Sequence, residues 1–451
     1  MNGLKVLVSG DLHIGRNEKV AEAGEKGVAA SEAWGRIVDV AIQEKVLVVC
    51  LTGDVADDHN KFTEARSVLE KGLRLLGDNG IKTVAVSGNH DFGVLSHLND
   101  SFPDEVFQLL GSEHKWERVN IHNPDSGRIV LSIDGWSYLE RFVSNQQPIE
   151  SYDFLREGDW PVLAMIHGEL NNRDTKYAFL PRESMLKKPV DGWLLGHKHR
   201  RALVETPGSP FIIFPGSPQA LHANEKGIHG VEIINLDQTI KSQFRQVPIS
   251  TVRYVGPDEF QIDLTPFDQN IERTDPNNYV LDKIRDKVEK VKIESGEFLK
   301  YVVLRLLLSG QTDLANDIKA LNGLLSELVE TRESSLDFQG VYCSIDKVDC
   351  TVLPKIDLYE ESKRKGPIGL VALALIELEE KPTSEYSPST RKLFDKAKGD
   401  IETYRKKYNH TIHDETDDDN ASDEILDHEL KTSIRTQLSA VLLTHRSRGQ
   451  I

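Results

Sequence analysis

The chain of 451 residues has little cysteine, few aromatic residues and no long apolar run. Its three cysteines, Cys50, Cys343 and Cys350, have neither the spacing of a disulfide framework nor that of a thiolate zinc site. The longest apolar stretch, Ile368–Ile376, is about half the length that a membrane-spanning helix needs. No apolar segment of a signal peptide follows Met1. We therefore expect a cytoplasmic protein that is neither a disulfide scaffold nor a membrane protein.

An excess of positive charge is also lacking, since 72 acidic and 55 basic residues give a net charge of −17. A protein that binds nucleic acid by itself is usually basic, because contacts with phosphates supply most of its affinity. The charge balance therefore argues against strong unaided DNA binding. The charge balance does not exclude a nuclease, because bound divalent cations and a partner subunit can supply positive charge locally.

What the sequence does contain, from Leu4 to Gly196, is an alternation of short β-branched runs with helical stretches. One predicted strand, Val46–Leu51, is apolar throughout, as is typical of a strand whose two faces are both covered. Helices are predicted at Val28–Glu44 and Thr63–Leu76. This alternation predicts an α/β fold with layered sheets. Arg201–Val247 is mostly strand and turn, which indicates antiparallel strands that close a sandwich.

Two further regions follow residue 248. The first is a small α+β module with the predicted elements helix Tyr279–Val291, strand Tyr301–Leu308, helix Leu314–Arg332 and strand Val341–Leu353. The second begins near Gly366 and has the predicted helices Ile368–Glu379, Ser389–Tyr408 and Asp423–Arg446. Its acidic run at 413–424 is interpreted as a solvated linker. Because the length favours two or three domains, we expect domains at 1–248, 262–355 and 366–451.

Polar clusters follow five of the predicted strands, at the edge where open α/β sheets bind their ligands. The clusters are Ser9–His13, Thr52–Asp57, Ser87–Asp91, His167–Glu169 and Gly196–His199. One such cluster by itself is usually a turn, and one histidine is usually a hydrogen-bonded core residue. Together the clusters offer two carboxylates, one amide oxygen and four imidazoles besides His90, namely Asp11, Asp54, Asn89, His13, His167, His197 and His199.

This set of oxygen and nitrogen ligands predicts a particular kind of metal site. Mixed carboxylate, amide and imidazole ligands suit Mn²⁺, Fe²⁺ or Zn²⁺ rather than Ca²⁺ or a thiolate zinc site. Seven ligands are too many for one tetrahedral ion but fit two ions that share a bridging carboxylate. Two ions about 3.5–4 Å apart are the common arrangement for the hydrolysis of phosphate esters. We therefore expect a two-metal phosphoesterase.

Five segments resemble the motifs of a known family, the calcineurin-like metallophosphoesterases. They are Asp11-Leu12-His13, Gly53-Asp54-Val55-Ala56-Asp57, Gly88-Asn89-His90-Asp91, the single His167 and Gly196-His197-Lys198-His199. The resemblance covers about residues 4–235. It implies a four-layer α/β/β/α sandwich for this part of the chain.

The resemblance also implies a role for each residue of the set. The first metal ion would be held by Asp11, His13, Asp54 and His199. The second would be held by Asn89, His167, His197 and Asp54, with Asp54 bridging the two ions. His90 would face the phosphate as a catalytic residue, and Asp57 would orient His90. Mn²⁺ is the expected metal.

Other segments resemble one branch of this family, the SbcD-type nuclease subunits of double-strand-break repair. These segments are Gly10–Gly15, Phe214–Pro218, Asn224–Gly230 and Leu304–Thr312. In this branch a capping domain that contacts DNA follows the phosphoesterase domain, and C-terminal helices dock on an SMC-like ABC ATPase of the SbcC type. The resemblance implies both partners, with 262–355 as the capping domain and 366–451 as the partner-binding region.

We therefore predict a Mn²⁺-dependent DNA exonuclease and endonuclease, the nuclease subunit of a complex with that ATPase in DNA repair or defence. Two alternatives stay open. One is a small-molecule phosphodiesterase or phosphatase of the same superfamily, although the residues beyond 248 favour a larger substrate. The other is a non-catalytic binding subunit, against which the complete ligand set and His90 argue. The sequence leaves open whether the chain forms a homodimer.

Overall fold

The computed structural model divides the chain into two compact units. By number, the first unit comprises 1–261, 280–306 and 327–348, and the second comprises 262–279, 307–326 and 349–451. The residues that the structure describes are 4–15, 29–57, 62–113, 115–143, 147–236, 242–266, 275–316, 322–324, 326, 336–354, 357–408, 434 and 437–438. These two units do not test the predicted domains at 1–248, 262–355 and 366–451, so that division stays a prediction.

Some predicted features lie outside the described residues. These features are the acidic run at 413–424, most of the helix Asp423–Arg446 and much of the helix Leu314–Arg332. No helix in the described ranges is both long enough and apolar enough to cross a membrane.

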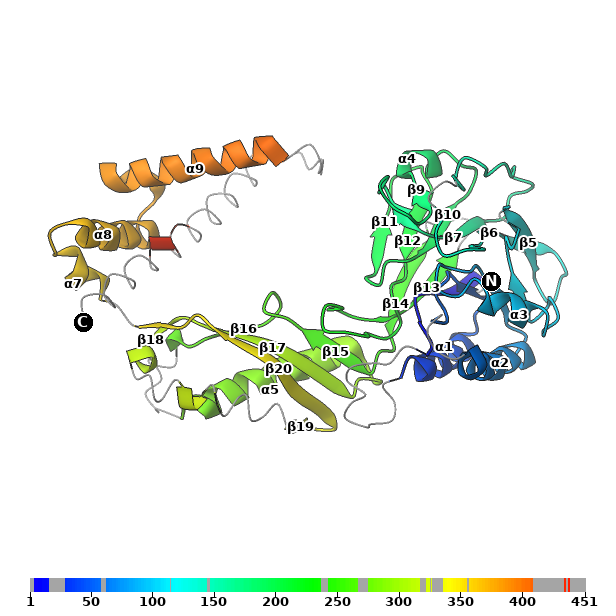
Figure 1. Cartoon of the computed structure of the whole chain (residues 1–451), viewed down its shortest axis with the longest axis horizontal. Helices are drawn as coiled ribbons and strands as arrows, with labels where there is room; N and C mark the ends of the chain where they lie inside the picture. The colour runs from blue at the N-terminus through cyan, green and yellow to red at the C-terminus, as the bar shows by residue number, and fades with distance from the viewer. Residues whose placement is uncertain are drawn as a thin grey trace. The chain divides into compact units, whose positions relative to one another are not determined.

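Two six-stranded sheets form the core of the first unit (Figure 1). The first sheet has the strand order β14-β13-β1-β2-β3-β4. Its strands are β1 Leu4–Ser9, β2 Val48–Leu51, β3 Lys82–Ala85, β4 Phe107–Leu109, β13 Gly230–Leu236 and β14 Gln243–Pro248. Strands β1 to β4 run parallel, whereas β13 pairs antiparallel with both β1 and β14.

The second sheet has the strand order β11-β12-β10-β7-β6-β5. Its strands are β5 Glu117–His122, β6 Ile129–Trp136, β7 Val162–His167, β10 Gly192–Gly196, β11 Ala202–Val204 and β12 Phe211–Phe214. The four inner strands are parallel, and β5 and β11 pair antiparallel at the two edges. Parallel strands place their carboxyl ends at one edge of a sheet, so the clusters that follow β7 and β10 lie together.

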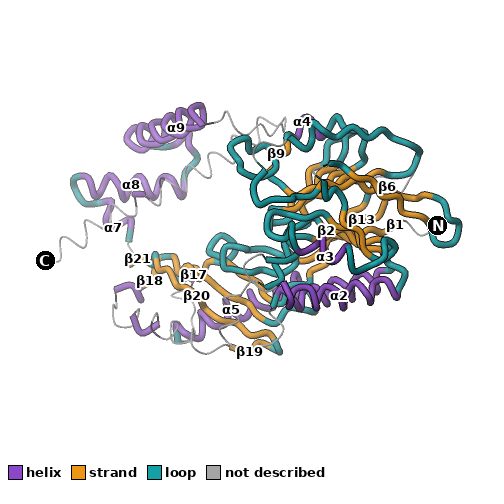
Figure 2. Tube along the Cα trace, turned by 45° about the vertical axis from the view of Figure 1, so that its right-hand side comes forward, coloured by secondary structure: helices purple, strands orange, loops and turns teal. Residues whose placement is uncertain are grey.

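Alternate residues of β1 contribute to two different cores. Val6 and Val8 belong to the core between the sheets, together with Met165 of β7. Leu7 belongs to the core between the first sheet and its helices (Figure 2). These helices are α1 Ala30–Glu44, α2 Phe62–Asp78 and α3 Val94–Asn99. Because both faces of β1 are covered, its central residues are all apolar, and each buried side chain of this size stabilises the fold by about 1.5–3 kcal/mol.

An aromatic core covers the outer face of the second sheet. The ring of Tyr152 lies 5.0 Å from that of Trp116 and 5.9 Å from that of Trp193. Strands β6, β7, β10 and β12 contribute buried residues to this core, for example Trp136 and Ile166, and loops and the short helix α4, Arg182–Met185, cover them. The predicted α/β/β/α sandwich is confirmed, with its fourth layer reduced in the described residues to α4 and these loops.

A buried ion pair joins β5 and β6 to this aromatic core. The side chain of Asp134 is fully buried, and Arg118 donates to its two oxygens at 2.6 and 2.9 Å. The hydroxyl of Tyr152 donates to the same carboxylate at 2.5 Å. Since removal of one partner of such a pair costs about 3–5 kcal/mol, the pair fixes the register of this edge of the sheet.

A third sheet has the strand order β15-β17-β20-β19, and β16 also pairs with β17. Its strands are β15 Val252–Val255, β16 Gln261–Asp263, β17 Tyr301–Ser309, β19 Leu336–Phe338 and β20 Val341–Cys350. The helix α5, Pro276–Ser295, buries Val280, Ile284 and Val288 along one face. The predicted helix Tyr279–Val291 and the strands predicted at 301–308 and 341–353 are therefore present. Short strands β18 Gln311–Thr312 and β21 Leu353–Pro354 pair with one another.

Helices end the described part of the second unit. They are α7 Leu358–Ser362, α8 Pro367–Glu380 and α9 Pro388–Tyr408. The side chain of Asp357 caps α7 by accepting from the backbone N–H of Glu360 at 3.0 Å. Leu378, Tyr386 and Phe394 pack together between α8 and α9. The predictions of helices at 368–379 and 389–408 are confirmed.

Candidate metal centre

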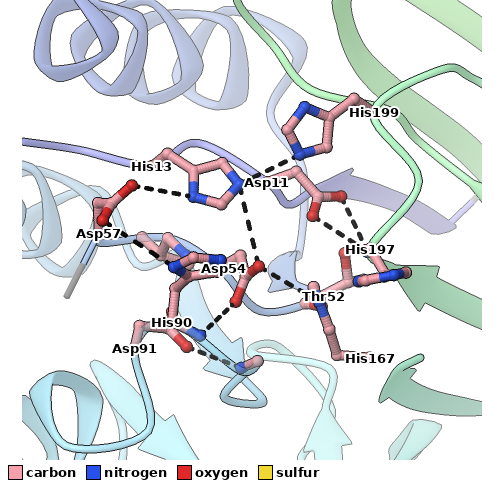
Figure 3. A network of polar contacts seen from close by, with 12 residues as sticks. Asp11, His13, Thr52, Asp54, Asp57, His90, Asp91, His167, His197 and His199 are labelled. Atoms are coloured by element: carbon pink, nitrogen blue, oxygen red, sulfur yellow. Dashed lines mark hydrogen bonds and ion pairs between the residues drawn. The ribbon is translucent and has the colours of Figure 1, made fainter. Parts of the chain in front are cut away.

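Eight of the nine predicted site residues come together where β1, β2, β3, β7 and β10 end (Figure 3), and the ninth, Asn89, directly precedes His90 in the loop after β3. Three groups of side chains have ligand atoms within 4.8 Å of one another. The groups are Asp11, His13 and His199; Asp11, Asp54 and His167; and His13, Asp57 and His90. The centre therefore receives residues from both sheets of the sandwich, and most of these side chains are buried.

Asp54 is the residue that the two predicted ligand sets share. Its Oδ2 atom lies 3.4 Å from Nε2 of His167 and 3.9 Å from Nε2 of His13. Its Oδ1 atom accepts a hydrogen bond from the backbone N–H of His90 at 2.9 Å. One oxygen of Asp54 thus faces a histidine from each set, which is the position that a bridging carboxylate requires.

Several atoms of the centre have the donor chemistry that a divalent cation needs. Nε2 of His13 and Nε2 of His199 lie 3.1 Å apart, so without an ion one ring can donate to the other, and with an ion both nitrogens are placed to bind it. Nδ1 of His167 lies 3.0 Å from the carbonyl oxygen of Thr52, so the proton belongs on Nδ1 and the lone pair of Nε2 faces the centre. Oδ1 of Asn89 is buried and accepts no hydrogen bond from the described residues. These atoms fit the two-ion set.

The backbone is strained where it delivers these side chains. Asp11, His13, Asp54 and His197 have φ angles of 53°, 50°, 52° and 99°. Non-glycine residues rarely adopt such angles, and they persist only where the surrounding structure enforces them. Here the strands that precede these residues are buried on both faces, so the packing of the sheets keeps the backbone at these angles.

A glycine allows the loops after β2 and β3 to approach closely. A Cβ atom on Gly88 would lie 2.2 Å from Oδ1 of Asp54, which is far inside contact distance. The glycine of the Gly88–Asp91 motif is therefore required by the close approach of a second loop rather than by its own turn.

Asp91 is a functional residue whose role the sequence reasoning missed. It is fully buried, and its two oxygens accept from the backbone N–H groups of Gly88 and Val55, each at 2.7 Å. Burial and the nearby charge of Asp54 raise the pKa of its carboxyl group to about 7. Asp91 thus joins the loop that carries Asn89 to the loop that carries Asp54. The sequence feature that could have indicated this role is the position of Asp91 as the last residue of the Gly88–Asp91 motif.

Two further carboxylates contact candidate ligand histidines. Oε1 of Glu225 lies 2.5 Å from Nδ1 of His199, and its Oε2 accepts from the backbone N–H of Leu221 at 2.6 Å. Oε1 of Glu169 lies 3.2 Å from Nε2 of His197. Such carboxylates fix the tautomer and the orientation of a ligand histidine. The sequence reasoning noted both residues within motifs but gave neither a role.

The charges within the centre compensate one another. Burial raises the pKa of Asp11 to about 6. Burial also opposes ionisation of Asp54, but the neighbouring His167 and His13 hold its pKa below the usual range. For His167, burial acts against protonation, yet Asp54 raises its pKa to about 9. Burial lowers the pKa of His197 to about 4. A bound cation would replace the proton of His167 as the partner of Asp54.

His90 and Asp57 lie beside the predicted ligands. Nδ1 of His90 lies 3.9 Å from Oδ1 of Asp57, and the His90 side chain is 22% exposed. Oδ2 of Asp57 lies 3.7 Å from Nδ1 of His13. Asp57 is thus shared between His90 and a candidate ligand, which extends the single orienting role that the sequence predicts.

Comparison with known proteins gives matches for this part of the chain. The family described as "Calcineurin-like phosphoesterase" matches residues 4–201. The uncharacterized metallophosphoesterase YhaO of Bacillus subtilis (strain 168) is 29% identical over 203 residues, which cover 44% of this chain and 48% of YhaO. The chain thus spans about half the length of YhaO.

A second relative matches over a longer part of the chain. The DNA double-strand break repair protein Mre11 of Sulfolobus acidocaldarius is 22% identical over 324 residues, which cover 70% of this chain and 77% of that protein. Among solved structures, a dimetal phosphatase from Danio rerio superposes with a TM-score of 0.36 at 13% identity, covering 55% of this chain and 99% of that chain.

The shared position of Asp54 leads to a prediction for metal binding. Asp54→Asn should lower Mn²⁺ occupancy at both positions, because removal of one charge from a shared ligand weakens two sites together. Metal analysis after gel filtration measures the number of ions per chain. Asp104→Asn, the same change at an exposed carboxylate, is the control. Full occupancy in Asp54→Asn would refute the bridge.

Proposed function

Since residues 4–201 form a calcineurin-like metallophosphoesterase domain, we propose that the chain hydrolyses phosphodiester bonds in DNA. The family match confirms the resemblance that the motifs predicted, and the domain is a phosphoester hydrolase domain. The observation that carries the proposal is the convergence of acids and histidines at the carboxyl ends of five strands, where seven of them form groups whose ligand atoms lie within 4.8 Å of one another. A clustered set of buried acids and histidines in this form serves hydrolysis rather than scaffolding.

Two features support DNA as the substrate. The aligned region shared with Mre11 is 324 residues long, so it extends beyond the domain at 4–201. The residues beyond that domain include the sheet of β15, β16, β17, β19 and β20, of which β17, β19 and β20 lie within 262–355, the predicted capping domain. The match to YhaO supports the phosphoesterase chemistry and leaves the small-molecule substrate as the competing function.

We assign the metal ligands as the sequence predicts them. Asp11, His13, Asp54 and His199 would hold one ion, and Asp54, Asn89, His167 and His197 the other. Two divalent ions, with Mn²⁺ the proposed metal, supply Lewis acidity to the phosphate and lower the pKa of water. Glu225 and Glu169 would hold the imidazoles of His199 and His197 in the tautomer that leaves the required nitrogen free for the ion.

His90 is proposed as the residue that gives a proton to the leaving oxygen. Its backbone is fixed by the hydrogen bond to Asp54, and its ring is partly exposed at the surface of the centre. Asp57 would stabilise the protonated ring during this transfer. The ring lies outside both proposed ligand sets, so proton transfer does not compete with metal binding at this residue.

We also propose a protein partner, an SMC-like ABC ATPase of the SbcC type, for the C-terminal helices. The helical group α7 to α9 leaves large apolar side chains exposed, with Leu370 56% and Leu393 37% exposed. The helix α8 has apolar residues on all sides, and a helix of this kind is normally covered by other parts of its own chain or by another chain. The proposed activity and partner are compatible with a role in DNA repair and with a role in defence.

The proposed activity predicts Mn²⁺-dependent cleavage of DNA by the purified chain. Linear single-stranded and duplex oligonucleotides with a fluorescent label should be cut, and EDTA should abolish cleavage. Bis(p-nitrophenyl) phosphate measures the same chemistry on a small diester. Hydrolysis of the small diester without any cleavage of DNA would contradict the DNA proposal and favour the small-molecule function.

His90→Asn separates catalysis from metal binding. The variant should lose about 10²–10⁴-fold in kcat, the usual contribution of general-acid catalysis, and should keep its Mn²⁺ content and melting temperature. His97→Asn, the same change at an exposed histidine of α3, is the matched control. A kcat within a few-fold of wild type rejects the proton-donor role.

Removal of residues 357–451 tests the partner. This truncation ends before Asp357 and so removes α7 to α9 together. Cleavage of short single strands should persist, because the metal centre lies in the first unit. Association with an SbcC-type ATPase should be lost in co-purification. Recovery of the complex at full yield would show that the ATPase binds elsewhere.

A further inference from the structure

A group of aromatic and basic side chains lies beside the candidate metal centre, with Phe142, Lys176 and Leu139 exposed and Tyr177 and Arg141 half-buried. We call this group the aromatic ledge and define it by Phe142, Tyr177, Lys176, Arg141 and Leu139. The ring centroids of Phe142 and Tyr177 lie 6.1 Å apart. The Lys176 ammonium lies 4.5 Å from the centroid of Phe142, and the Arg141 guanidinium lies 5.9 Å from it. Phe142 is 44% and Leu139 is 41% exposed, so neither is a core residue.

The ledge is in contact with a candidate ligand. The ring of Tyr177 lies 4.6 Å from the ring of His197. From the metal centre outward the order is therefore His197, Tyr177 and Phe142. A phosphodiester held at the centre would bring an adjoining nucleotide of its strand toward these rings.

The ledge is also rigidly attached to the centre. The backbone N–H of Val143 donates to the carbonyl oxygen of Lys176 at 3.0 Å, which joins its two segments. The hydroxyl of Tyr138 accepts from the N–H of Ala178 at 2.7 Å, and the carbonyl of Tyr138 accepts from Ser87 at 2.7 Å. Ser87 directly precedes the Gly88–Asp91 motif. The segments that carry the exposed rings are thus fixed to the loop that carries Asn89.

We propose that the aromatic ledge stacks unpaired bases of the DNA strand next to the phosphate that is cleaved. Exposed aromatic rings beside cations are the features with which proteins bind single strands without reading sequence, through base stacking and phosphate contacts. In this subsite Phe142 and Tyr177 offer ring faces, and the long side chain of Lys176 can leave the ring of Phe142 for a phosphate. The subsite rests on the proposed function, and it adds a preference for substrates with unpaired nucleotides at the cleavage position.

Two other roles, packing of the core and binding of a protein partner, explain the ledge less well than base stacking does. Packing of the core does not require Phe142, because the neighbouring Trp136 and Tyr138 are buried while Phe142 is not. A protein partner would also cover exposed rings, but the contact of Tyr177 with His197 places the ledge next to a proposed metal ligand, which a substrate subsite requires and a partner surface does not. Either role predicts that loss of the Phe142 ring leaves the kinetics of a purified chain unchanged.

The decisive measurement is the kinetics of the Mn²⁺-loaded, full-length chain on a single-stranded oligonucleotide. Phe142→Ala should raise KM about tenfold with kcat nearly unchanged, which is the signature of lost substrate binding. Phe142→Tyr should restore the wild-type KM, whereas Phe142→Leu should not, because leucine keeps the apolar bulk but offers no ring to stack. Leu75→Ala, at a side chain that is also 44% exposed, is the matched control.

Lys176→Ala tests the phosphate contact separately. The slope of log kcat/KM against log salt should become shallower by about 0.7 for a single strand, the value for one lost phosphate contact. Lys187→Ala removes a lysine outside the ledge and should leave the slope unchanged. An unaltered slope in Lys176→Ala would remove this residue from the subsite.

The outcomes distinguish the ledge from the proposed function. The kcat for bis(p-nitrophenyl) phosphate should be the same in wild type and in Phe142→Ala, which shows that the metal centre is intact. Its KM is not compared, because its own nitrophenyl rings can stack on the ledge. If wild type cleaves this diester but no DNA, the proposed function fails and the subsite fails with it. If wild type cleaves DNA and Phe142→Ala has the wild-type KM, only the ledge proposal is overturned, and the exposed rings are left to a protein partner.

Discussion

The buried carboxylate of Asp54 is the group around which the centre is organised. It lies between His13 and His167, and it accepts the backbone N–H of His90. A carboxylate removed from water is tolerated only where neighbouring groups compensate its charge. The loops after β1, β3 and β7 must therefore converge on the loop after β2, and the two sheets are held in the one arrangement that allows this convergence.

The apolar strands make this convergence possible for the backbone. Residues such as Asp11 and His13 adopt left-handed backbone angles directly after a strand that is buried on both faces. An unsupported loop would relax to a lower-energy conformation, whereas a loop anchored in two cores cannot. Asp91 adds a second constraint, because it binds backbone groups of two loops at once. The packing that stabilises the sandwich therefore also fixes the geometry of the centre.

Segments on two sides connect the centre to the rest of the first unit. On one side, Glu225 contacts His199, and the nearby Ala220 packs against Tyr254 and Val303 of the third sheet. On the other side, Tyr177 contacts His197 and continues into the aromatic ledge. The centre is therefore placed between a sheet that follows the sandwich in sequence and a group of exposed rings.

Strand periodicity was sufficient to predict the layered fold and the polar clusters that follow its strands, whereas the role of each of the nine site residues came from the resemblance to a family and stays a prediction. The reason is physical: a buried strand needs a continuous apolar run, and parallel strands bring their carboxyl ends to one edge, so residues such as Asp11 and Asp54 meet whatever their separation in the chain. Glu225, Glu169 and Asp91 could not be given roles in this way, because one acidic residue after a turn has no periodicity. Their roles depend on which histidine or backbone N–H lies within about 3 Å.

The ledge of Phe142 and Tyr177 likewise exists only in three dimensions, since the two rings are brought together by the backbone hydrogen bond between Val143 and Lys176. Sequence determined which strands must be buried and which side chains end them, and the tertiary structure alone decided which of those side chains touch.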